Sequence, residues 1–182
     1  MIYVLLAKGF EEIEALTVVD FLRRAELEVY TVGIGGKIIS GSHNIPVFCD
    51  LDESEADTSD NLEAVVLPGG MPGTLNLEAN AKVQELIDFC AENDKYICAI
   101  CAAPSILGHK GLLNGKKATC FPGFEGELEG ADVQDSFVCT DGKIITAKGM
   151  GAAISFSQEI ASKLLNDNSK SDKIKNSLQC PF

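Results

Sequence analysis

A cysteine stands at the junction between an apolar run and a helical pattern. Residues 96–100 are β-type and apolar, and they lead directly to Cys101. After the cysteine come Ala102, Ala103 and Pro104. Small neighbours allow a tight bend, and proline suits a first helical turn, where its missing N–H is not needed. We predict that Cys101 is a nucleophile on a strand-to-helix elbow, where the helix dipole and free amides lower the pKa of its thiol.

A glycine pair ends another predicted strand. Pro68, Gly69 and Gly70 follow the apolar run 63–67. Such a pair commonly serves only as a turn that needs positive φ. Beside a nucleophile, its backbone N–H groups can also face a developing oxyanion. Both interpretations stay open from the sequence alone.

Acidic residues begin the first predicted helix, directly after the apolar strand 1–7. Their ordinary role is to complement the helix dipole, which suffices for Glu11 and Glu12. Glu14 lies one turn further and can point inward toward Cys101. Partial desolvation would raise the pKa of this carboxyl and let it share a proton with the thiol.

The chain offers little support for a histidine base or for a metal centre. His43 falls in a hairpin loop, where a solvated turn residue is expected and an accessory group for the site is the alternative. His109 lies about 12 Å along the helix from Cys101, which is too far for a direct base, and we expect it to cap that helix before Gly111. Cys98 and Cys101 form a C-x-x-C, but no second one completes a zinc site. We expect neither metal nor cofactor.

Composition predicts one globular domain. The chain has 182 residues, 46% of them hydrophobic and 23% charged, with a formal net charge of −12. This charge argues against nucleic acid and anionic membranes as partners. An odd set of seven cysteines favours reduced thiols and a cytoplasmic protein. The N-terminus lacks a basic region before its apolar run, which favours a strand over a signal peptide.

The order of elements predicts an α/β fold. Strand-like runs alternate with amphipathic helices and include two hairpins; the runs are 1–7, 28–33, 37–39, 45–49, 63–67, 96–100, 117–120, 136–139 and 143–147, and the helices are 11–25, 82–93 and 152–165. This pattern indicates a mainly parallel sheet covered on both faces, with sites at the carboxyl ends of its strands. We expect a single domain, 1–182, with a core over 1–166 and a polar tail or short helix over 167–182.

Several segments together resemble the ThiJ/PfpI superfamily, in the branch of the parkinsonism-associated protein deglycase and the bacterial ThiJ-type proteins. They are LAKGFEEIE at 6–14, VVLPGG at 65–70, AICAAP at 99–104 and, more weakly, TAKGMG at 146–151. The resemblance runs from Met1 to about residue 165. It implies a flavodoxin-like three-layer sandwich that forms a homodimer.

The same resemblance implies roles for particular residues. Cys101 would be the reactive, easily oxidised cysteine, and Glu14 the carboxylic acid that hydrogen-bonds its sulfur. The oxyanion-binding residues would be Gly69, Gly70 and Ala102, with the amides of Gly70 and Ala102 forming the pocket. Family members are credited with cofactor-free conversion of glyoxal and methylglyoxal to hydroxy acids, with protein deglycation and with redox-linked chaperone activity.

Four positions matter for transferring these activities. Ala102 stands where the PfpI-type proteases carry histidine, which argues against peptidase activity. Phe121 replaces the histidine of a Thr-His-Pro segment, which favours the bacterial sub-branch and weakens the case for glyoxalase chemistry. Met150 replaces a usual proline. Arg24 matches a basic residue that approaches the site across the dimer, an ordinary surface charge being the alternative.

Two functions therefore remain from the sequence. The first is an enzyme in which Cys101 processes a small aldehyde such as methylglyoxal. The second is a stress-responsive, chaperone-like protein in which an oxidant converts Cys101 to sulfinic acid. A buried core thiol without function is the third, plainer interpretation.

Overall fold

The computed structural model describes residues 1–179 and contains a seven-stranded sheet. Its strands lie in the order β10-β11-β7-β6-β1-β2-β5. Their bounds are β1 Ile2–Ala7, β2 Val29–Ile34, β5 Leu51–Asp52, β6 Ala64–Leu67, β7 Tyr96–Ile100, β10 Val138–Asp141 and β11 Ile144–Ala147. All neighbours pair in parallel except β10 with β11. The predicted mainly parallel sheet is confirmed.

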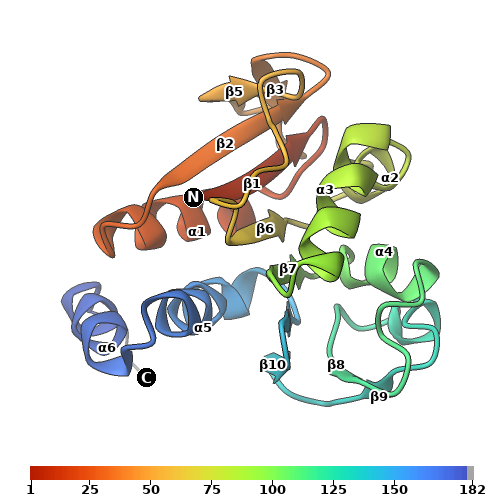
Figure 1. Ribbon diagram of the computed structural model, residues 1–182, viewed down its shortest axis with the longest axis vertical. Coiled ribbons are helices and arrows are strands. Elements are labelled where there is room, and N and C mark those ends of the chain that lie inside the picture. The colour runs from red at the N-terminus through yellow and green to blue at the C-terminus, as the bar shows by residue number, and fades with distance from the viewer. Residues whose placement is uncertain (180–182) are drawn as a thin grey trace.

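Helices cover both faces of this sheet, as Figure 1 shows. On one side lie α1 (Glu12–Arg24), α5 (Ala153–Leu165) and α6 (Asn168–Ser177), and on the other α2 (Gly73–Glu78), α3 (Ala81–Glu92) and α4 (Pro104–His109). Two apolar clusters fill the two interlayer spaces. Alternate residues of β1 enter opposite clusters, Tyr3 and Leu5 the first, Val4 and Leu6 the second. The coverage of both faces predicted from continuous apolar strands is confirmed, and so is the three-layer sandwich that the resemblance implied.

Two short sheets complete the strands. The predicted hairpin forms from β3 (Ile38–Ser40) and β4 (Pro46–Phe48), which pair antiparallel. A second small sheet joins β8 (Lys117–Ala118) to β9 (Asp132–Val133), and β9 was not predicted from the sequence. Short 3₁₀ turns, η1 (Glu125–Glu127) and η2 (Met150–Ala152), lie near the carboxyl edge.

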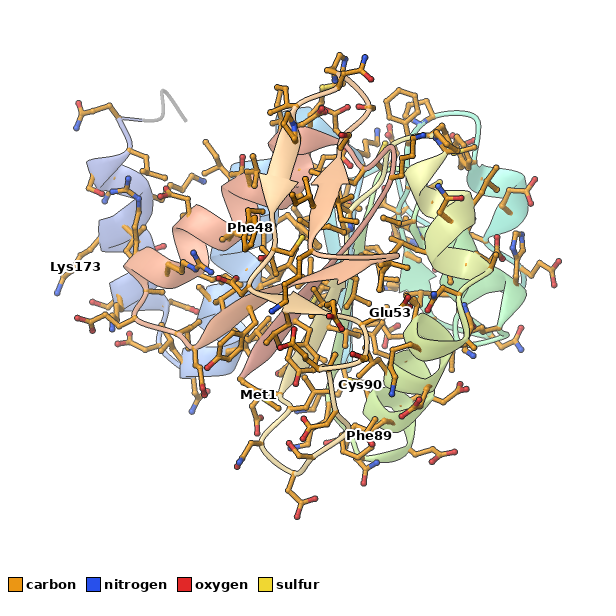
Figure 2. All side chains as sticks on the ribbon, turned by 90° about the horizontal axis from the view of Figure 1, so that it is seen from above. Met1, Phe48, Glu53, Phe89, Cys90 and Lys173 are labelled. Atoms are coloured by element: carbon orange, nitrogen blue, oxygen red, sulfur yellow. The ribbon has the colours of Figure 1, made fainter. Side chains whose placement is uncertain are left out.

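The C-terminal segment forms a helix on the outside of the molecule. Helix α6 packs against α5 and buries only Ser171, whose hydroxyl lies 2.5 Å from that of Ser162. Figure 2, which labels Lys173 on α6, shows this helix away from the sheet. No helix in the described part of the chain is both long and apolar enough to cross a membrane.

Candidate active site

Cys101 occupies a strained elbow directly after β7. Its φ is +67°, in the left-handed region, and α4 begins three residues later at Pro104. A non-glycine residue held there costs of order 1 kcal/mol, so the surrounding structure must fix it. Its N–H donates to the carbonyl of Ala147 at 2.9 Å, and its carbonyl accepts from the N–H of Phe121 at 2.8 Å. The predicted sharp turn is present, and two neighbouring segments hold it.

Glu14 reaches the same place from the first turn of α1. The side chain is completely buried, and its Oε2 accepts a hydrogen bond from the N–H of Gly69 at 2.9 Å. Its other oxygen, Oε1, has no hydrogen-bond partner among residues 1–179. Burial raises the pKa of this carboxyl to about 7, although contact with the Cys101 thiol and the Gly69 amide lowers it in part. The group is therefore poised to gain or lose a proton near neutral pH.

The thiol of Cys101 is harder to ionise than the sequence suggested. Burial, followed by the negative charge of Glu14 and a hydrogen bond with it, raises the pKa of the thiol to about 12. Helix α4 has only six residues, so its dipole is small. The amides of Ala102 and Gly70 do favour the thiolate, but they do not offset burial. The expectation that the elbow lowers this pKa is wrong.

These two pKa values describe one shared proton. Between a pH of about 7 and about 12, Glu14 and Cys101 together hold one proton and one negative charge. A proton that leaves the sulfur can move to Glu14, and this transfer removes the charge that opposes the thiolate. A thiol and a carboxyl that share a proton in this way can couple proton transfer to attack by sulfur.

The glycine pair after β6 fits only without side chains. A Cβ on Gly69 would lie 2.6 Å from the Cβ of Cys101 and 2.8 Å from Oε2 of Glu14. Since the N–H of Gly69 already donates to Glu14, it is not free for an oxyanion. The amides of Gly70 and Ala102 approach the sulfur and donate to no other group within the described chain. Two free amides in this position are the donors that the predicted oxyanion site requires.

Strand order explains why these segments meet. Strands β7, β6 and β1 are neighbours in the sheet, so the loops that follow their carboxyl ends lie together. Phe121 joins them from a fourth segment. A Cβ on Gly149 would lie 3.1 Å from the Phe121 ring and 3.7 Å from Oε1 of Glu14. Phe121 thus occupies a position beside the carboxyl, where it provides an apolar wall and no base.

Glu12 has a different environment from Glu14. It accepts from the backbone N–H of His43 at 2.8 Å, and its Oε2 lies 2.9 Å from Nδ1 of His43 and 3.0 Å from the hydroxyl of Ser42. Burial alone would raise the pKa of Glu12, but these hydrogen bonds lower it to about 2. Glu11 also contacts Ser42. These acidic residues therefore fasten the β3–β4 hairpin to α1, a role that the sequence did not reveal.

The potential metal ligands in this cluster already bind one another. Glu11, Glu12 and His43 have ligand atoms that all lie within 4.8 Å of each other. Their hydrogen bonds, directly and through Ser42, account for this closeness. The imidazole of His43 is mostly exposed, and the carboxylate of Glu12 raises its pKa.

The remaining basic candidates lie outside this geometry. Arg24 pairs with Asp20 at 2.6 Å in the last turn of α1, about 15 Å along the helix axis from Glu14. His109 ends α4 as expected, but its imidazole bridges two carboxylates, Glu78 at 2.5 Å and Glu127 at 2.9 Å. Within one protomer, neither side chain has a direct part in the chemistry of Cys101.

The chain matches known proteins over almost its whole length. The model of the DJ-1/PfpI family matches residues 1–163. Protein dj-1beta of Drosophila melanogaster is 35% identical over 164 residues, which cover 88% of this chain and 87% of that protein. A deglycase of Pyrococcus abyssi is 30% identical over 167 residues, covering 90% and 98%.

Solved structures agree with this assignment. A cysteine-to-alanine mutant of a DJ-1 superfamily protein from Salmonella typhimurium superposes with a TM-score of 0.94 at 33% identity, covering 100% of this chain and 98% of that one. Oxidised DJ-1 of Toxoplasma gondii superposes with a TM-score of 0.93 at 31% identity, with the same coverage. By sequence and by fold, the chain belongs to the DJ-1/PfpI family.

Proposed function

We propose that this protein is a cysteine-dependent, cofactor-free enzyme that converts reactive 2-oxoaldehydes, such as methylglyoxal, to hydroxy acids. One observation carries the proposal. The thiol of Cys101 lies beside a fully buried carboxyl, Glu14, whose pKa is about 7 and whose Oε1 has no partner in the described chain. Relatives named deglycases, from Pyrococcus abyssi and Thermococcus kodakarensis, add support.

The reaction follows from the groups present. The sulfur of Cys101 adds to the aldehyde carbon C1 while its proton passes to Glu14, and the amides of Gly70 and Ala102 stabilise the resulting oxyanion. Glu14 then gives this proton to the oxyanion, which completes a hemithioacetal and leaves Glu14 ionised. Glu14 then removes the proton from C1 and a proton is returned at C2, so that C1 reaches the oxidation level of a thioester as the C2 ketone becomes an alcohol. Water hydrolyses the thioester, which releases the hydroxy acid and restores the thiol.

The proposal is tested by following methylglyoxal consumption and lactate formation in wild type and in Cys101→Ser. Cys139→Ser is the matched control, since Cys139 is the other described cysteine that is only partly buried. We expect Cys101→Ser to abolish turnover and Cys139→Ser to retain it. Equal turnover in wild type and Cys101→Ser would exclude the mechanism, and absence of lactate in all three would leave the enzyme proposal without support.

A second candidate function rests on the unpartnered oxygen of Glu14. Once Cys101 is oxidised to a sulfinate, a protonated Glu14 can donate a hydrogen bond to one of its oxygens and stop oxidation before sulfonic acid. We propose this redox-sensing, chaperone-like role as the alternative. Mass spectrometry under limiting peroxide should find Cys101 modified before Cys49 and Cys139. Cys180, the seventh cysteine, lies outside the described residues and needs the same check.

We also propose that the protein acts as a homodimer. Large apolar side chains are exposed on α1 and on the β3–β4 hairpin: Ile13, Leu16, Ile38, Ile45 and Phe48, the last labelled in Figure 2. A second copy would cover this face, and it is the one setting in which Arg24 could approach a Cys101 site. Light scattering of wild type and Ile13→Glu tests the association.

The six described cysteines are all free, which favours a reducing compartment such as the cytoplasm.

A further inference from the structure

A small apolar pocket lies on the surface beside the Cys101 site. It has a volume of about 160 Å³. Its walls include Phe121, Pro122, Phe137 and Met150, with Lys148 at the same pocket. Phe137, Phe121 and Met150 are 67%, 41% and 46% exposed, which is unusual for three large apolar side chains gathered in one place. These residues come from three separate segments, so the sequence gives no signal for the pocket.

The pocket adjoins the reacting groups. Gly149, which also lines it, is the residue whose Cβ would meet both the Phe121 ring and Oε1 of Glu14. The backbone of Phe121 is hydrogen-bonded to Cys101 itself. In a 2-oxoaldehyde, a ring attached to C2 lies only roughly 4 Å from the attacked carbon C1. A molecule bound to Cys101 can therefore extend a substituent over Gly149 into the pocket.

Size and chemistry favour an aromatic substituent. A cavity of about 150 Å³ lined by apolar side chains is known to hold one benzene ring. Here two phenyl rings and a thioether line the pocket, and aromatic groups pack favourably against both kinds of side chain. The ammonium of Lys148 lies 5.8 Å from the centre of the Phe137 ring and pairs with Asp135. The cation thus lies over one face of the Phe137 ring at the rim of the pocket.

We propose that this pocket is a substrate subsite and that the natural substrates are 2-oxoaldehydes with an aryl substituent, Phe137 being the main determinant of specificity. The inference rests on the proposed attack by Cys101 and names the substrate class for that site. It also gives Phe121 a role. The phenyl ring of Phe121 stands where relatives carry a histidine, and in this protein that position would hold the apolar substituent of the substrate.

A trapping experiment tests the subsite without requiring turnover. Phenacyl bromide and bromoacetone both react with thiols by the same displacement: the sulfur–carbon bond forms, bromide leaves and the thiol proton is released. Rates of Cys101 labelling are measured by mass spectrometry in wild type, Phe137→Ser and Leu75→Ser. Each rate is divided by the rate with N-acetylcysteine. Leu75 is 52% exposed on α2 and does not line the pocket, so it controls for loss of an exposed apolar side chain.

After division by the N-acetylcysteine rates, we expect wild type and Leu75→Ser to react about tenfold faster with phenacyl bromide than with bromoacetone. Phe137→Ser should lose most of this preference. The same order should appear in kcat/KM for phenylglyoxal relative to methylglyoxal. Aryl preference in trapping without consumption of either aldehyde would contradict the proposed function but retain the subsite.

Other results would overturn the subsite. The subsite is rejected if wild type prefers phenacyl bromide over bromoacetone no more strongly than N-acetylcysteine does. It is also rejected if Phe137→Ser keeps the preference of wild type. Labelling of other cysteines in place of Cys101 would overturn both proposals. If Phe137→Ser alters light scattering but not the labelling ratio, a second copy of the chain covers the pocket, and the subsite is rejected.

Discussion

Two carboxyl groups on the first turn of α1 both expose little surface to solvent, and yet their pKa values shift in opposite directions. Glu12 is 5% exposed and Glu14 is fully buried. The pKa of Glu12 is lowered to about 2, whereas that of Glu14 is raised to about 7. Burial raises the pKa of both carboxyls but acts more strongly on Glu14, which lies deeper in the protein. Their partners add to the difference, because His43 and Ser42 satisfy Glu12 while Oε1 of Glu14 has no partner in the described chain.

This contrast separates a structural carboxylate from a chemical one. Glu12 is an anion that fastens a hairpin to the helix, and its hydrogen bonds leave it little tendency to accept a proton. Glu14 has a pKa of about 7, so it can both hold and release a proton near neutral pH, and it lies beside the thiol. A buried group left incompletely satisfied is the one that is available for proton transfer.

The largest expected effect is a difference in kcat between the variants Glu14→Gln and Glu12→Gln. We expect Glu14→Gln to lower kcat by about 10³-fold, because no other described side chain beside Cys101 replaces its proton transfers. Glu12→Gln should change kcat by less than about threefold, since its partners belong to the hairpin. Lactate formation at saturating methylglyoxal measures both. Wild-type turnover in Glu14→Gln would show that Glu14 takes no part in the mechanism, and the contrast with Glu12 would then have no bearing on catalysis.

A second comparison uses two glycines, one at the site and one away from it. Gly69→Ala places a methyl group against the Cβ of Cys101 and Oε2 of Glu14, and we expect about a 10²-fold loss of turnover. Gly126→Ala is the control, because its Cβ meets nothing within 4 Å and it does not line the pocket beside Phe121. Circular dichroism distinguishes a displaced thiol from a failure to fold. Full activity in a folded Gly69→Ala would show that contact between Glu14 and Cys101 is not needed.

The third prediction concerns stability as a function of pH. The folded state raises the pKa of Glu14 from 4.5 to about 7, so the native protein holds a proton that the unfolded chain releases. The free energy of unfolding therefore falls as pH rises from 4.5 to 7, by up to about 3 kcal/mol. Glu14→Gln should lack this fall. Urea unfolding of both proteins at pH 5 and pH 8 measures it, and parallel curves would contradict the raised pKa.

Glu12 should give the opposite slope. Its pKa falls from 4.5 to about 2 on folding, so its stabilising effect is complete above pH 4.5 and is lost as pH falls toward 2. The imidazole of His43 is 68% exposed, and solvent screening reduces the expected effect to about 1–2 kcal/mol. Glu12→Gln should be less stable than wild type at pH 6 and approach it at pH 3. If both variants change stability in the same direction, partners do not explain the contrast.

Local patterns predicted the sheet and the elbow because short-range physics decides both. The bounds of β7 agree with the apolar run 96–100, and Cys101 adopts the sharp turn that its small neighbours allow. The pKa of its thiol could not be predicted in the same way. It depends on burial and on the charge of a carboxyl from a distant segment, and both outweigh a helix dipole of six residues.

Contacts between distant segments also escaped the sequence. Nothing near His43 indicates that it binds Glu12, since the hairpin and the helix meet only in the folded chain. The pocket beside Phe121 and Phe137 likewise combines a loop, a hairpin and a glycine turn. Helix α2 was not predicted because it has six residues and begins at a glycine, too short a segment for periodicity to mark.

The smallest expected effect concerns His109, whose partly exposed imidazole lies between two carboxylates. Two carboxylates, Glu78 and Glu127, raise the pKa of His109, and the imidazole is 36% exposed. The protonated bridge stabilises the fold fully below pH 6.5 and less as pH rises through the folded pKa. Because of solvent screening, we expect His109→Gln to cost less than about 1 kcal/mol at pH 6 and almost nothing at pH 9. Turnover should stay unchanged, since α4 keeps its backbone contacts with η1 at Gly108. A loss that persists at pH 9 would mean that His109 acts through packing, not through its charge.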